Sequence, residues 1–203
     1  RNILDPQQIA DLENFEGNAQ ALRIITKLHR LIGKNGMHLT SAVMDTIIKY
    51  PCDSLTMMKE KQKPKHERNL LKKKIGYFQS EQEQFAMIKN NTGTRNTRNP
   101  LCFLLEAADD LAYTFADLED GYNKGLYTYQ DLLDVVIKAG DEKGKALLEK
   151  ELENGIQEQI GSKTSVDPYK YAVFSWLTKK QLYSVSRVSD AFILHYDEIM
   201  NGE

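Results

Sequence analysis

One segment constrains the fold more than any other, because its pattern fits only an amphipathic helix. Residues 101–122 read LCFLLEAADDLAYTFADLEDGY. At about 100° per residue, the leucines, most of the alanines and Phe115 fall on one arc of a helix. Tyr113 falls on the opposite arc with four carboxylates, namely Glu106, Asp109, Asp117 and Asp120. Pro100 would occupy the first turn, where proline is favourable. We therefore expect a long helix over residues 100–122.

The polar arc of this helix concentrates negative charge. Six carboxylates and no lysine or arginine lie between residues 101 and 122. Like charges one turn apart cost about 0.2–0.5 kcal/mol each when exposed, and far more when buried without a cation. The pattern predicts either a solvated acidic face, which is the commoner case, or a face that is held by a divalent metal ion or by arginines from another helix.

The rest of the chain also carries helical signals. Only 5 prolines occur among 203 residues, and no stretch shows sustained alternation of apolar and polar residues, so we predict an all-α fold. Start and stop residues place helices at 15–31, 41–49, 80–89, 100–122, 128–140, 141–160 and 168–200, the last of which is long enough to be two helices. The expected caps are Thr40, Ser80 in a capping box with Glu83, Thr128 and Asp167.

Two stretches lack the helical pattern. Residues 52–76 are basic and contain Pro64, and residues 90–99 are polar, so we expect an irregular basic segment and a loop. Eight basic and two acidic residues between Lys59 and Lys74 could hold phosphates, although a charged surface loop is the commoner explanation. No change in composition marks a boundary, so we predict a single helical domain over residues 1–203.

Composition excludes several classes of protein. Apolar residues make up 41% of the chain and the net charge is −2, which is typical of a globular protein and not of a polycation. No apolar run approaches the ~18 residues that span a bilayer, and no signal-peptide pattern occurs. Cys52 and Cys102 are too few for a disulfide framework, which indicates a reducing, cytoplasmic setting. Because the first residue is Arg1, we interpret the chain as part of a longer protein.

Four motifs follow one another along the chain. They read FEGNAQALRIITKL from residue 15, LTSAVMDTIIKYP from residue 39, GYFQSE from residue 76 and EAADDLAYTFADLEDG from residue 106. In this order, and with the weaker HYDEIMNG from residue 195, they resemble the motifs of deoxynucleoside triphosphate triphosphohydrolases. These are the dGTPase-type members of the HD-domain metal phosphohydrolases. The resemblance implies a compact multi-helix HD-domain-like bundle, of which this chain holds the central and later part.

The resemblance implies the hydrolysis of a deoxynucleoside triphosphate, with dGTP expected, to deoxynucleoside and inorganic triphosphate. Such a reaction needs a metal ion that polarises the phosphoryl group and lowers the pKa of a water molecule. Mg, Mn or another transition metal would suit carboxylate and imidazole ligands. Asp109 matches the family's metal-binding aspartate, and Asp110 would support that ligand from beside it.

The same helix would recognise the sugar. Tyr113 matches the tyrosine that packs on the deoxyribose and leaves no room for a 2′ hydroxyl, and Asp117 matches the carboxylate that bonds the 3′ hydroxyl. Asn18, Gln20 and Lys49 lie in matched segments and are expected to line the site. Without the resemblance, Tyr113 would be interpreted as a core aromatic. Asn18 and Gln20 would tie helices together, and Lys49 would favour a helix C-terminus.

The chain also departs from the family pattern. The family's first histidine, its His-Asp pair, and its catalytic histidine and glutamate all precede the FEGNAQ motif, so we expect no catalytic residue in this chain and no activity from it alone. Asn99 replaces the usual histidine before Pro100.

The resemblance also implies partners. Family members form homo-oligomers, commonly hexamers, and some respond to dNTP or DNA effectors. The rival hypothesis is a non-catalytic helical module that binds nucleotide or single-stranded DNA, or mediates assembly, through residues 59–74.

Overall fold

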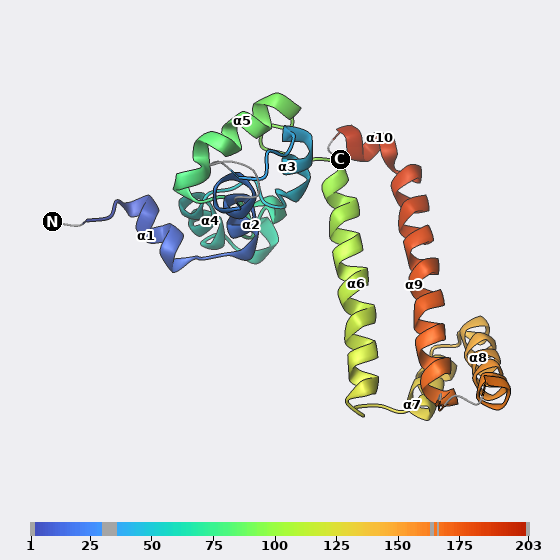
Figure 1. The fold of residues 1–203 in the computed structure, drawn as a ribbon. Coiled ribbons are helices and arrows are strands. Elements are labelled where there is room, and N and C mark those ends of the chain that lie inside the picture. Colours follow the sequence, from blue (N-terminus) through green and yellow to red (C-terminus); the bar gives the residue numbers. More distant parts are fainter. Residues whose placement is uncertain (1–2, 30–35, 163–164, 166, 202–203) are drawn as a thin grey trace. The chain divides into compact units, whose positions relative to one another are not determined.

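The computed structural model describes residues 3–29, 36–162, 165 and 167–201, and these residues form helices and no strand (Figure 1). The all-α prediction is confirmed. The α-helices are α1 (Pro6–Glu13), α2 (Gly17–Arg23), α3 (Ser41–Ile47), α4 (Ser54–Lys61), α5 (Gln82–Thr92), α6 (Leu101–Asn123), α7 (Tyr129–Lys138), α8 (Glu142–Ser162), α9 (Pro168–Leu194) and α10 (Tyr196–Asn201). A π-helix, η1 (Ile24–Leu28), continues α2. None of the helices in the described residues is long and apolar enough to cross a bilayer.

Side-chain caps begin three helices as predicted. The hydroxyl of Thr40 accepts from a backbone N–H in the first turn of α3, and the carboxylate of Asp167 does the same at α9. At α7 the cap is reciprocal, because Thr128 and Asp131 each accept a hydrogen bond from the backbone of the other. The long C-terminal run is indeed two helices, α9 and α10.

The predicted capping box at Ser80 is wrong. Its hydroxyl donates instead to the carboxylate of Glu81, at 2.8 Å, and α5 starts at Gln82 without a side-chain cap. Glu81 is fully buried and pairs with Lys27 at 3.2 Å, so the Ser80 hydroxyl donates to a carboxylate that a tertiary ion pair holds in the interior.

Helix α1 begins with a signal that the sequence prediction missed. Asp5 accepts from the Gln8 N–H at 2.9 Å, and the Gln8 side chain accepts from the Asp5 N–H at 3.1 Å. Pro6 occupies the first turn. This is a complete capping box, formed by aspartate and glutamine.

The basic segment 52–76 is more regular than the sequence suggests. Asp53 caps α4 by accepting from the Thr56 N–H at 2.8 Å. Arg68 donates to the carbonyls of Lys61 and Lys63 at 2.6 and 2.8 Å and so closes the C-terminal end of the helix. The polar loop is likewise shorter than residues 90–99, because α5 continues to Thr92 and ends at Gly93, where φ is 76°.

The described contacts divide the chain into two compact units. The first unit comprises residues 1–106 and 195–203, and the second comprises residues 107–194, so that the division falls within α6. The single domain expected from the sequence stays a prediction, because two compact units can still fold together.

In the first unit, a buried ion pair joins α3 to α5. Asp45 and Lys89 lie 2.6 Å apart, with side chains 0% and 4% exposed. Thr94 donates to the other carboxylate oxygen at 2.8 Å, and Lys89 also donates to the carbonyl of Thr97 at 2.8 Å. Beside this ion pair lies one buried apolar cluster, which comprises Leu22, Met44, Ile48, Phe85 and Ile88.

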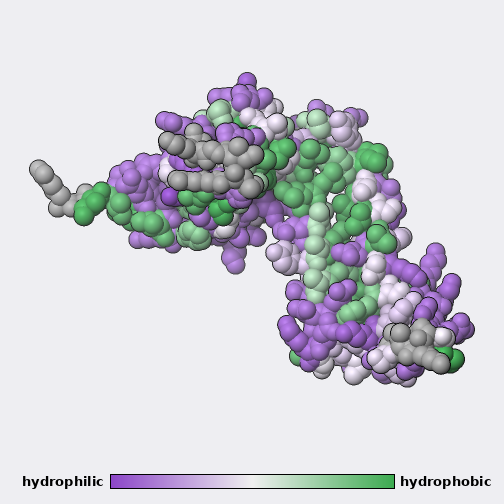
Figure 2. Space-filling view, viewed as in Figure 1, coloured by the Kyte–Doolittle hydropathy of each residue, from purple (hydrophilic) through white to green (hydrophobic). Residues whose placement is uncertain are grey.

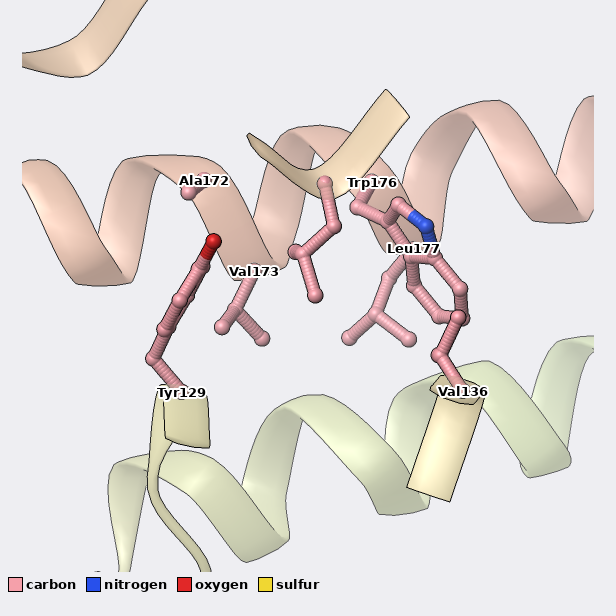
Figure 3. Packing of buried hydrophobic residues seen from close by; sticks show 7 residues of the cluster. Tyr129, Val136, Ala172, Val173, Trp176 and Leu177 are labelled. Carbon is pink, nitrogen blue, oxygen red and sulfur yellow. The ribbon is translucent and has the colours of Figure 1, made fainter. Parts of the chain in front are cut away.

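In the second unit, α7, α8 and α9 enclose an apolar core (Figure 3). Its buried members are Tyr129, Val136, Leu148, Ala172, Val173, Trp176 and Leu177. The indole of Trp176 donates to the carbonyl of Gly144 at 2.8 Å, which satisfies its buried N–H. Beyond this core, apolar side chains of α9 stay exposed, among them Leu182 and Leu194, and apolar patches lie over the long helices in Figure 2.

Removal of the ammonium from the buried pair should destabilise the protein strongly. Lys89→Met keeps a long side chain but leaves the Asp45 carboxylate buried and unpaired, which costs about 3–5 kcal/mol. The free energy of unfolding in urea measures this effect. Lys124→Met is the matched control, since it breaks an exposed pair with Asp120 at 3.5 Å and should cost less than about 1 kcal/mol. Similar losses for the two variants would contradict the structural role of the buried pair.

The stability of the protein at low pH tests the buried ion pair in a second way. Burial would raise the pKa of Asp45, but hydrogen bonds from Lys89, Thr94 and Thr92 and the Lys89 charge outweigh burial and lower the pKa. The stability that Asp45 contributes is therefore complete above its unfolded pKa of about 3.9 and declines as the pH falls toward the folded value. Urea titrations between about pH 5 and pH 2 should show this loss in the unsubstituted protein.

Candidate active site

The predicted acidic helix is α6, and three of the predicted site residues form a line along it. Asp109, Tyr113 and Asp117 are one turn apart and span about 12 Å of the helix axis. All three are exposed, Tyr113 by 67%. Phe115 and Tyr122, on roughly the opposite side of the helix, pack against the core of the second unit. The line therefore faces away from that core.

Asp110 is also exposed but lies about 100° around the helix from Asp109. It is thus beside the line and not a member of it. Its predicted role as a support for Asp109 stays a prediction.

The described residues contain no complete metal site. No three histidine, cysteine, aspartate or glutamate side chains gather closely enough in these ranges to hold a metal. Mg, Mn and related ions take several protein ligands or waters. Among the described residues the donor set around Asp109 is therefore incomplete, and its role as a metal ligand stays a prediction.

In the first unit, one carboxylate gathers an amide and an ammonium group. Oε1 of Glu16 accepts from Nδ2 of Asn18 at 2.9 Å and from Nζ of Lys74 at 3.2 Å. Asn18 is a predicted site residue, whereas nothing in the local sequence distinguishes Lys74 from Lys72 and Lys73. Its contact with Glu16, 58 residues away, identifies it in the structure.

A small core holds the backbone segments of this region together. It contains Ala19, Cys52, Met57, Ile75 and Phe78. The N–H of Gly76 donates to the carbonyl of Cys52 at 2.9 Å. Ala19, Cys52 and Ile75 therefore pack in one cluster. In the sequence, they lie next to or near Asn18, Lys49 and Lys74, respectively. Burial, reinforced by the Asp53 carboxylate, raises the pKa of the Cys52 thiol to about 11, so this cysteine is a protonated core residue and not a nucleophile.

Lys49 lies beside the start of α6. Its Nζ is 3.7 Å from Oε1 of Glu106, whose Oε2 lies 2.6 Å from Nη1 of Arg98. Glu106 is one of the six carboxylates for which the sequence leaves open either a solvated face or a cation, from a metal ion or from arginines of another helix. Two cations are present, although both come from segments between helices and neither comes from a helix.

Gln20 lies apart from Asn18. The two residues are about 160° apart around α2, and Gln20 lines a cavity of about 770 Å³ together with Phe15, Arg23 and Phe78. The structure therefore groups Asn18 with Lys74 and places Gln20 at a different surface of the first unit.

Comparison with known proteins gives consistent matches. The chain is 37% identical over 204 residues to a deoxyguanosinetriphosphate triphosphohydrolase-like protein of Listeria monocytogenes, covering 98% of this chain and 41% of that protein. It is 35% identical over 147 residues to a protein of the same description from Synechocystis, covering 68% of this chain and 33% of that protein. It is 32% identical over 169 residues to the deoxyguanosinetriphosphate triphosphohydrolase of Yersinia enterocolitica, covering 79% of this chain and 30% of that protein. No protein-family model matches the chain.

The close approach at Gly76 predicts a strong and specific defect. A Cβ at this position would collide with the backbone carbonyl of Tyr50, next to Lys49. Gly76→Ala should therefore lower the free energy of unfolding by about 2–4 kcal/mol, because backbone cannot move aside as a side-chain tip can. Thermal and urea unfolding measure the loss. Gly17→Ala is the control, since nothing lies within 4 Å of its Cβ, and it should leave stability nearly unchanged.

Proposed function

Because the chain belongs to the dGTPase-type family of deoxynucleoside triphosphate triphosphohydrolases, we propose that the complete protein hydrolyses a deoxynucleoside triphosphate to deoxynucleoside and inorganic triphosphate. dGTP is the expected substrate, as the names of the relatives suggest. The chain spans about 41% of the length of the Listeria protein, so we propose the activity for the complete protein. The observation that supports it most directly is the exposed line of Asp109, Tyr113 and Asp117 on α6.

The line has the chemistry to read a deoxynucleotide. Residues one turn apart on a helix are about 5–6 Å apart, a step that suits neighbouring groups of one nucleotide. Tyr113 would pack on the deoxyribose and exclude a 2′ hydroxyl, while the Asp117 carboxylate would accept a hydrogen bond from the 3′ hydroxyl. Asp109, at the other end, would lie toward the 5′ side as one ligand of a divalent metal. When bound, this metal would polarise the α-phosphate and lower the pKa of a water molecule.

The triphosphate needs cations and hydrogen-bond donors. Asn18 and Lys74 already point their donors at the shared Glu16 carboxylate, and Lys49 faces Glu106 in the same way. We assign these three side chains to the phosphates, because ammonium and amide donors form charge-assisted hydrogen bonds with phosphate oxygens. We also propose that the complete protein forms a homo-oligomer and that a dNTP or DNA effector regulates it.

A product-resolved assay tests the reaction. The complete protein, incubated with each dNTP and Mg or Mn, should release deoxynucleoside and inorganic triphosphate, whereas the 203-residue chain alone should not. Asp109→Ala should lower turnover by at least about a hundredfold. Asp134→Asn, an exposed carboxylate on α7, is the matched control and should have no effect.

The other outcomes are equally informative. Release of a deoxynucleoside diphosphate and phosphate would overturn the proposed reaction. Full turnover by Asp109→Ala would overturn the ligand assignment. Nucleotide or single-stranded DNA binding with a steep salt dependence and no hydrolysis would favour the non-catalytic module instead.

Substitution of Tyr113 should weaken discrimination between sugars. Without the ring, space for a 2′ hydroxyl becomes available, so Tyr113→Ala should lower the preference for dGTP over GTP by about tenfold or more. The ratio of kcat/KM for the two nucleotides measures the preference. Tyr183→Ala, which removes a similarly exposed ring from α9, should leave the ratio unchanged. An unchanged ratio for Tyr113→Ala would contradict its role at the sugar.

A further inference from the structure

Arg98 lies at the centre of a network that contacts both the backbone and the side-chain partner of Lys49. Its Nε donates to the carbonyl of Lys49 at 2.7 Å, and its Nη1 donates to Oε2 of Glu106 at 2.6 Å. The second oxygen of Glu106 then lies 3.7 Å from Nζ of Lys49. One guanidinium group therefore fixes the main chain of Lys49 and also orients the carboxylate that faces its ammonium.

The surroundings hold Arg98 in place. Its side chain is 14% exposed, and the guanidinium carbon lies 5.4 Å from the ring centre of Tyr50 and 5.9 Å from that of Phe103. A planar guanidinium can stack flat on an aromatic ring while its N–H groups donate in fixed directions, whereas an ammonium is a compact charge with rotatable donors and no plane to stack. The geometry thus depends on arginine specifically and not simply on a positive charge.

The contact between Glu106 and Lys49 is an ion pair without a direct hydrogen bond. At 3.7 Å the two groups attract each other but are too far apart for a direct hydrogen bond. A lysine side chain loses up to about 2 kcal/mol of rotamer entropy when it is immobilised. If a carboxylate already restricts the lysine side chain before a ligand binds, the lysine loses less rotamer entropy on binding.

We propose that Arg98 and Glu106 are positioning residues, which hold the Lys49 ammonium ready for the phosphates of the substrate. This inference rests on the proposed function, and it adds a role for two side chains that need not touch the substrate. The same network ties the first turns of α6 to the Lys49 segment.

A double-mutant cycle distinguishes positioning from a general structural role. The probe is inorganic triphosphate, and its affinity for the complete protein is measured by calorimetry. Glu106→Gln should raise the Kd about fivefold to tenfold, and Lys49→Met should raise it further. In the Lys49→Met background, Glu106→Gln should have no additional effect, because Glu106 acts through Lys49.

Kinetics give an independent readout. Glu106→Gln and Arg98→Lys should both raise KM for the dNTP while kcat stays within about twofold, as expected when ground-state and transition-state binding weaken equally. The control Glu149→Gln removes a carboxylate from an exposed pair with Lys145 and should change neither constant.

Three results would overturn the inference. These are unchanged or tighter triphosphate binding by Glu106→Gln, an equal loss in the presence and absence of Lys49, and a loss of kcat that parallels a loss of thermal stability. If the unsubstituted protein does not release triphosphate, the proposed function fails and this inference fails with it. If the unsubstituted protein is active and the cycle shows no coupling, only the positioning role fails.

Discussion

The network of Lys49, Arg98 and Glu106 depends on the buried ion pair of Asp45 and Lys89. An apolar pair of similar volume could stabilise α3 against α5 equally well, because burial of two charges costs nearly as much as their attraction returns. An apolar pair, however, could not form the hydrogen bonds that this ion pair makes with the following loop. Through Thr94 and the carbonyl of Thr97, the pair orders the loop that leads directly to Arg98. Arg98 in turn holds Lys49 and the start of α6.

The second unit uses a similar device for a different purpose. Glu151 on α8 is 1% exposed and accepts hydrogen bonds from Lys179 and Ser175 of α9 at 2.5 and 2.6 Å. Burial alone would raise the pKa of Glu151, but these hydrogen bonds and the Lys179 charge outweigh burial and lower the pKa. These bonds therefore join α8 to α9 at defined positions along both helices. Because α6 meets this core through Phe115 and Tyr122, its line of site residues is left facing outward.

Local signals were sufficient for most of the helices. Caps at Thr40, Thr128 and Asp167 operate as predicted, and the missed helix α1 had a readable capping box at Asp5. The error at Ser80 has a different cause. Its hydroxyl had a local partner available, but the buried Glu81 carboxylate required donors, and an unsatisfied buried charge costs more than a lost cap.

The sequence by itself determined most of the helices and the line of Asp109, Tyr113 and Asp117, because helical hydrogen bonds join residues only four positions apart and so impose a periodicity that can be counted along the chain. The tertiary structure alone decided which distant groups meet. It brought Lys74 to Asn18 through Glu16, joined Lys49 to Glu106 through Arg98, and placed Gln20 elsewhere. These contacts link residues that are up to 58 positions apart. Their geometry follows from the packing of whole helices and loops, for which no local spacing rule exists.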